Sequence, residues 1–151
     1  MPDKSTIRKA LKDKQQGKSA GTQAGEFVHD EIEKIRDGEH GARSAKQAIA
    51  IGLSEARRAG VKLKPPKKGT VSEKTRANAE RESKAGKKGK PISVKRSRAR
   101  IKALKKEPRK TVSSAALSRQ TKSAARKRSP ASRSAAAKEA ARTRKTNAGG
   151  K

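Results

Sequence analysis

Residues 44–60, which read SAKQAIAIGLSEARRAG, decide the fold of this chain because they carry the signals of both ends of a helix. The stretch opens with Ser44, and Gln47 follows three residues later, which is the pattern of a capping box. It closes on Gly60, which suits the left-handed position just beyond a helix. Between these ends, small and apolar side chains recur at the spacing of one helical face, namely Ala45, Ala48, Ile49, Gly52, Leu53 and Ala56. We therefore expect a helix over residues 45–59.

The residues before this stretch predict a second helix, over 23–37. Thr22 is expected to cap its start, and Gly38 is expected to end it. Its apolar residues also form a single stripe, namely Ala24, Phe27, Val28, Ile32 and Ile35. Because the connector 38–43 is short, the two helices should be antiparallel neighbours, and residues 22–60 are expected to form a helical hairpin.

This hairpin has too few large apolar side chains to be stable alone. One source of support is the N-terminal segment, where Ile7, Ala10 and Leu11 have helical spacing. Another is a homodimer or a protein partner bound through the hairpin. Ile51 lies off the apolar stripe and would be exposed in a monomer, which favours the homodimer.

The composition of the whole chain predicts a mainly disordered protein with a small all-α part. Leu, Ile, Val and Phe number 18 of 151 residues, and the net charge is +29. A chain so charged and so poor in apolar residues is expected to be largely disordered. We therefore divide it into a basic N-terminal segment (1–21), the hairpin (22–60), a basic linker with a solvated helix (61–85) and a disordered tail (86–151).

The same composition argues against an enzyme. The apolar inventory does not allow a fully globular core of this length. There is no cysteine, which excludes thiolate metal sites. His29 and Glu33 are four residues apart but have no third metal ligand nearby. His40 is expected to make a hydrogen bond within the turn rather than to act as a general base. We expect no catalytic residues, no metal and no cofactor.

The N-terminus has no continuous apolar stretch of the kind a signal peptide needs. No run of 18 apolar residues occurs, so no membrane span is expected. Cytoplasmic location is the expectation.

Part of the hairpin resembles a known family. Residues 22–28 (TQAGEFV), 40–53 (HGARSAKQAIAIGL) and 56–60 (ARRAG) look like the common core of a family of small basic bacterial proteins. These proteins have no defined activity and are often labelled DNA-binding. The resemblance therefore implies DNA binding without a catalytic site.

The tail is similar in composition to the C-terminal tails of linker histones and to bacterial histone-like tails. It contains Ala135-Ala136-Ala137-Lys138 and Arg128-Ser129-Pro130. It lacks the Ser-Pro-x-Lys element of linker histones, because Ala131 and Ser132 follow Pro130.

The charge of the tail predicts a nucleic-acid partner. Residues 86–151 hold 23 Lys and Arg against two acidic residues, a net charge of +21. Such a polycation neutralises phosphates and releases condensed counterions. The candidate phosphate-binding residues are Arg57, Arg58, Lys62, Lys64, Lys67, Lys68, Lys87, Lys88, Lys90, Lys95, Arg96, Arg98, Arg100, Lys102, Lys105, Lys106, Arg109, Lys110, Arg126, Lys127, Arg128, Arg142, Arg144 and Lys145.

Duplex DNA is favoured over RNA, because most single-strand binders stack bases on aromatic side chains and this tail has none. The sequence thus predicts a sequence-tolerant, nucleoid-associated, histone-like protein. The alternative is an RNA- or ribosome-associated assembly protein. The acidic residues of the 23–37 helix are expected to face away from DNA. They are Glu26, Asp30, Glu31, Glu33 and Asp37.

Overall fold

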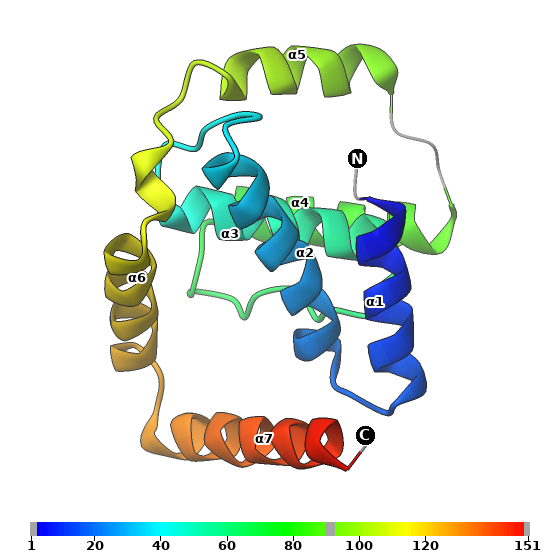
Figure 1. The fold of residues 1–151 in the computed structure, drawn as a ribbon, viewed down its shortest axis with the longest axis vertical. Helices are drawn as coiled ribbons and strands as arrows, with labels where there is room; N and C mark the ends of the chain where they lie inside the picture. Colours follow the sequence, from blue (N-terminus) through cyan, green and yellow to red (C-terminus); the bar gives the residue numbers. More distant parts are fainter. Residues whose placement is uncertain (1–2, 90–92, 150–151) are drawn as a thin grey trace. The chain divides into compact units, whose positions relative to one another are not determined.

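The computed structural model describes residues 3–89 and 93–149, and these residues are mainly helical (Figure 1). In chain order the described elements are α1 (Lys4–Gln15), α2 (Ala20–Arg36), α3 (Ala45–Arg58), α4 (Glu73–Lys87), α5 (Val94–Leu104), the 3-10 helix η1 (Lys110–Val112), α6 (Ser114–Arg126) and α7 (Pro130–Ala148). The chain divides into two compact units, Met1–Val112 and Ser113–Lys151.

The expectation of a mainly disordered chain is wrong. The described residues are all-α and 72% helical, and helices occupy most of the segment predicted to be a disordered tail. Two physical reasons account for the difference. In the first unit, small residues let helices pack with few large side chains. In the second, alanine-rich sequence and serine caps favour helix formation locally.

The predicted hairpin is present as α2 and α3. The Ser44 side chain accepts a hydrogen bond from the Gln47 amide, as the capping-box pattern predicts. Gly38 and Gly60 both have positive φ, 84° and 92°, which is the conformation that glycine favours just beyond a helix. The start of α2 differs from the prediction, because Ser19 rather than Thr22 is the N-cap and accepts a bond from the Thr22 amide.

Close backbone contact holds α2 against α3. A Cβ atom at Gly52 would lie 2.7 Å from the Val28 Cα and 2.9 Å from the Phe27 carbonyl oxygen. The helices therefore meet at a distance that only glycine allows. Phe27 is fully buried beside Ala24 and Ala56, so one aromatic ring fills the centre of this small core.

Helix α1 completes this core, as the spacing of the N-terminal apolar residues suggested. Ala10 is buried with Phe27, and Ile7 packs against the same cluster. Leu11, the third residue of that group, is 50% exposed. The described part of the N-terminal segment, residues 3–21, therefore belongs with the hairpin in one folded unit, and part of the support that the hairpin needs comes from this chain itself.

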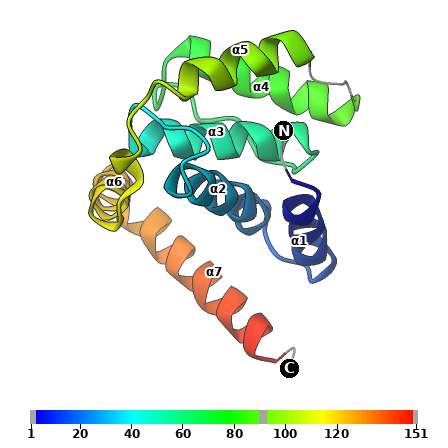
Figure 2. The same cartoon turned by 45° about the horizontal axis from the view of Figure 1, so that its top comes forward.

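Helix α4 packs on α3, and Figure 2 shows the two helices side by side. Ala79 is buried, and a Cβ at Gly86 would clash with the carbonyl oxygen of Arg57. The expected solvated helix is therefore partly buried, because small residues bring it close to α3. Ile51 was expected to be exposed in a monomer but is only 6% exposed within this one chain, which removes the observation that favoured a homodimer.

The segment after α5 is fixed to the connector of the hairpin. The Gly41 amide donates a hydrogen bond to the Leu104 carbonyl (2.9 Å), and the Ala42 amide donates one to the Pro108 carbonyl (3.1 Å). The Thr111 hydroxyl donates one to the Ala42 carbonyl (2.8 Å). A Cβ at Gly41 would clash with the Glu107 carbonyl oxygen, so this contact also depends on a glycine. Val112 is buried with Ile35 and Ala48.

The second unit consists of α6 and α7. Ser113 and Ser129 cap these helices, and each accepts a hydrogen bond from the amide three residues later. Pro130 stands in the first turn of α7, where its fixed φ favours a helix start. No described residue of either helix is buried, so their helical structure rests on local sequence rather than on a core.

Candidate nucleic-acid interface

Helix α5 carries the densest group of candidate cations in the first unit. Lys95, Arg98 and Lys102 are spaced three and four residues apart, so they share one face of the helix. We call these three residues the outer set, and all three are exposed. Arg96 and Arg100 are four residues apart and line a cavity on another side of α5. Lys105 and Lys106 follow the helix and are exposed.

The two candidate arginines of α3 are placed differently from expectation. Arg57 is only 8% exposed, and its Nε has no hydrogen-bond partner in the structure. The Arg58 guanidinium lies 3.5 Å from the Glu82 carboxylate of α4. Arg57 is therefore poorly placed to reach a phosphate, and Arg58 already has a counter-ion.

The other candidates of the first unit lie in connecting segments or at helix ends. Lys62, Lys64, Lys67 and Lys68 are exposed between α3 and α4, Lys87 and Lys88 at the end of α4, and Arg109 and Lys110 at η1. The Arg109 guanidinium is close to Gly38, where an added Cβ would lie 2.9 Å from it. Lys90 lies outside the described residues.

In the second unit the candidates lie on and between the two helices. Arg126 is in the last turn of α6, and Lys127 and Arg128 lead into α7. Arg142, Arg144 and Lys145 are in the C-terminal half of α7 and are exposed. Helix α7 contains one acidic residue, Glu139.

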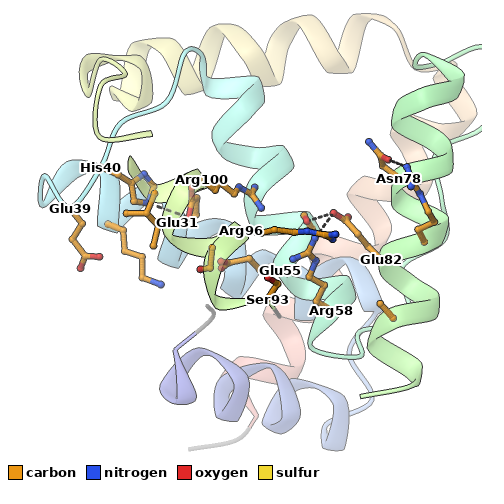
Figure 3. A pocket seen from close by; sticks show the side chains of 16 residues that line it. Glu31, Glu39, His40, Glu55, Arg58, Asn78, Glu82, Ser93, Arg96 and Arg100 are labelled. Atoms are coloured by element: carbon orange, nitrogen blue, oxygen red, sulfur yellow. Dashed lines mark hydrogen bonds and ion pairs between the residues drawn. The ribbon is translucent and has the colours of Figure 1, made fainter. Parts of the chain in front are cut away.

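A cavity of about 650 Å³ separates part of α5 from α2, α3 and α4 (Figure 3). Its lining holds four carboxylates and five cations, so the site is of mixed charge. The carboxylates are Glu31, Glu39, Glu55 and Glu82, and the cations are Lys34, Arg58, Arg81, Arg96 and Arg100. Figure 3 shows Arg96 and Arg100 extending from α5 into the space that the carboxylates line.

Several of these charges are paired within their own helices or across the α3–α4 contact. The Lys34 ammonium lies 2.6 Å from Asp30. Burial lowers the pKa of Lys34, but the hydrogen bond and charge of Asp30, with help from Glu55, raise that pKa above its ordinary value. The Ser54 hydroxyl donates a 2.5 Å hydrogen bond to Glu82, so Glu82 is held by both Ser54 and Arg58.

Glu31 is the most deeply buried acidic residue of the cavity, at 2% exposure. One carboxylate oxygen lies 3.7 Å from the His40 Nε2, and the other, Oε1, has no hydrogen-bond partner in the structure. Burial raises the pKa of the Glu31 carboxyl above its usual range, and the neighbouring charge of Glu55 raises it further, while His40, Lys34 and, least of the three, Arg100 act in the opposite direction.

The sequence analysis missed the burial of Glu31, because it grouped this residue with the acidic side chains expected to face away from DNA. A signal was available: Glu31 stands four residues from both Phe27 and Ile35, which places it on the buried stripe of α2. His40 matches expectation in part, since its Nδ1 lies 3.2 Å from the Gly41 carbonyl oxygen within the turn. The sequence did not indicate that its other nitrogen lies near Glu31.

In the part of the chain that the structure describes, no group of three or more His, Cys, Asp or Glu side chains is arranged to hold a metal ion. His29 is exposed on α2. Among the same residues, no helix combines the length and the apolar character that crossing a bilayer requires.

Comparison with curated proteins and with solved structures found no match. A family model does match part of the chain, over residues 13–68, and this range runs from the end of α1 through the α2–α3 hairpin. The hairpin and its flanks are thus similar to a family of unknown function (DUF6496).

Proposed function

We propose that this protein binds nucleic acid, duplex DNA in preference to RNA, by neutralising phosphates with cations that its helices expose. The observation that carries the proposal is the uneven distribution of charge along the chain. Residues 86–151 contain 23 Lys and Arg and two acidic residues, and every candidate cation of α5 is exposed. This excess is far above the net charge of about 2–8 that solubility asks of a small domain.

The helical structure changes how the cations would be presented. Helix α5 holds its outer set on one face, and α7, with 19 residues, extends about 28 Å at 1.5 Å per residue. Cations on such helices follow a phosphate backbone with a smaller cost in chain entropy than a disordered tail would incur. Because contacts to phosphates carry no base information, binding should tolerate any sequence, as in a nucleoid-associated, histone-like protein.

A salt-titrated competition between duplex DNA and structured RNA of equal length tests the proposal. If about ten side chains contact phosphates, log K should fall with log salt at a slope near −9. DNA should bind at least as tightly as RNA. If RNA binds tenfold more tightly at every salt concentration, DNA is the wrong partner and RNA or ribosome association replaces it. If neither polymer binds at 0.1 M salt, the proposal fails.

Charge-removing variants test the role of α5. Replacing the outer set (Lys95, Arg98 and Lys102) by Gln should reduce the magnitude of the salt slope by about 2.7, about 0.9 for each phosphate that the variant no longer neutralises. The matched control replaces Lys4, Lys9 and Lys12 by Gln, because these three are exposed on α1 and outside the candidate set. Equal reductions in the two triple variants would show that only total charge matters and would contradict a specific role of α5.

A further inference from the structure

Helix α5 is anchored mainly at its C-terminal end. Leu104 is the one residue of the described helix that is buried, and the hydrogen bonds that follow it fix residues 104–112 to the hairpin connector. Val94 and Ile101 are exposed, at 62% and 40%. Apolar packing therefore holds the end of α5 but not its length.

Along the rest of its length, α5 presents charged side chains, not apolar ones, toward the hairpin. Arg96 and Arg100 reach into the cavity that Glu31, Glu55 and Glu82 line (Figure 3). Both arginines nevertheless stay exposed to solvent. An interaction of this kind, between charges that keep access to water, is weak and exchangeable compared with a packed apolar contact.

Glu31 is the most deeply buried carboxylate of this cavity. A carboxylate buried to 2% exposure is costly unless charge or hydrogen bonds compensate it. Its Oε1 has no hydrogen-bond partner in the structure. His40 and Lys34 favour its ionised form, and Arg100, which lines the same cavity from α5, adds to their effect. The α5 arginines can thus pair with a carboxylate of the cavity or with a phosphate of nucleic acid, and the two anions compete for them.

We propose that the mixed-charge cavity under α5 contains an internal competitor for nucleic acid, the Glu31 carboxylate, which holds Arg100 until phosphates take its place. This inference rests on the proposed function and names the regulation of the same surface. Release would turn α5 about its fixed end at residues 104–112, so that Arg96 and Arg100 could contact phosphates together with the outer set. The free chain would then bind less tightly than its exposed cations allow.

A double-mutant cycle in the full chain tests the competition, with a 20-base-pair DNA duplex as the probe. Glu31→Gln removes the competing charge, so it should tighten binding about two- to fivefold, the fold-equivalent of a partly exposed ion pair. It should also steepen the salt slope by about 0.9 as one more phosphate is contacted. Arg100→Gln should weaken binding more in the Glu31→Gln background than in the wild type, because only there is Arg100 free.

Glu33→Gln is the matched control, since Glu33 lies on the same helix, carries the same charge and pairs with Arg36 at 2.9 Å outside the cavity. It should tighten binding less than Glu31→Gln does. Equal tightening by the two variants, or equal costs of Arg100→Gln in both backgrounds, would overturn the inference. In either case the effect of Glu31 would be only that of net charge.

A distance measurement separates this inference from the proposed function. The chain contains no cysteine, so Ala50→Cys on α3 and Ala99→Cys on α5, both exposed, accept a pair of spin labels. Glu31→Gln without DNA, and the wild type with DNA, should each lengthen and broaden the label distance. An unchanged distance in Glu31→Gln would overturn the docking of α5 even if DNA binds. Lack of DNA binding with a changed distance would overturn the proposed function instead and leave the docking intact.

Discussion

Helices α2 and α7 are similar in length, 17 and 19 residues, but they are stabilised in different ways. Helix α2 buries one face, including Phe27 and Ile35, against neighbouring elements. Helix α7 has no buried residue among those described and depends on its alanines, its Ser129 cap and Pro130. The first unit should therefore unfold cooperatively, whereas the helices of the second should melt gradually.

The largest expected effect is a difference in the stability cost of core truncation between the two units. Phe27→Ala should destabilise the first unit by about 3–5 kcal/mol, because it leaves a cavity at the centre of a small core. Leu117→Ala on α6 removes a half-buried side chain and should cost less than about 1 kcal/mol. Urea unfolding followed by circular dichroism compares the two variants. Similar costs would mean that α6 packs as firmly as α2 does.

A smaller effect tests the backbone contact within the hairpin. Gly52→Ala should destabilise the first unit by about 1–3 kcal/mol, because the added Cβ meets the backbone at Val28. Gly25→Ala is the matched control on α2, where nothing lies within 4 Å of the added atom. It should stabilise the helix by about 0.5–1 kcal/mol. Thermal unfolding measures both, and a stabilising Gly52→Ala would show that the helices are not in close contact.

The two serine caps give the sharpest local comparison. Ser44→Ala should lower the stability of the whole first unit by about 1 kcal/mol, because α3 is part of its cooperative core. Ser129→Ala should reduce the helix content of α7, while the midpoint of the unfolding transition of the first unit stays unchanged. Amide hydrogen exchange resolves both effects. A lower midpoint in Ser129→Ala would mean that the units are energetically coupled.

The smallest expected effect is the pH dependence caused by Glu31. Its pKa in the folded chain is raised above the ordinary 4.5, so the protonated form favours folding. That contribution is complete below about 4.5 and is lost as pH rises through the folded-state pKa. The wild type should therefore gain stability relative to Glu31→Gln as pH falls from neutral toward 4.5. Urea titrations at several pH values measure this difference, and a constant difference would contradict it.

The hairpin was predictable from sequence because its signals are local. The capping pattern at Ser44, the glycines after each helix and the apolar stripes all act within a few residues. The packing of α1 was also visible in the spacing of Ile7 and Ala10. These features do not require knowledge of distant parts of the chain.

The count of large apolar residues did not predict that the rest of the chain would be folded. Gly52, Gly41 and Gly86 meet distant backbone closely, and such close approaches leave no hydrophobic pattern. The mixed-charge cavity was missed because α5 follows the hairpin by more than thirty residues, and no local pattern links the two. Only the position of Glu31 on the buried stripe of α2 pointed toward it.

The close approaches at glycine have a consequence for how this type of chain can vary. Where two backbones touch, stability does not depend on side-chain bulk, so a core can persist while almost every outward position is given to lysine, arginine or serine. We expect chains related to this one to drift widely in composition yet to keep glycine at the positions of Gly52, Gly41 and Gly86. In such chains three residues without side chains would limit evolution more strictly than the aliphatic residues around them.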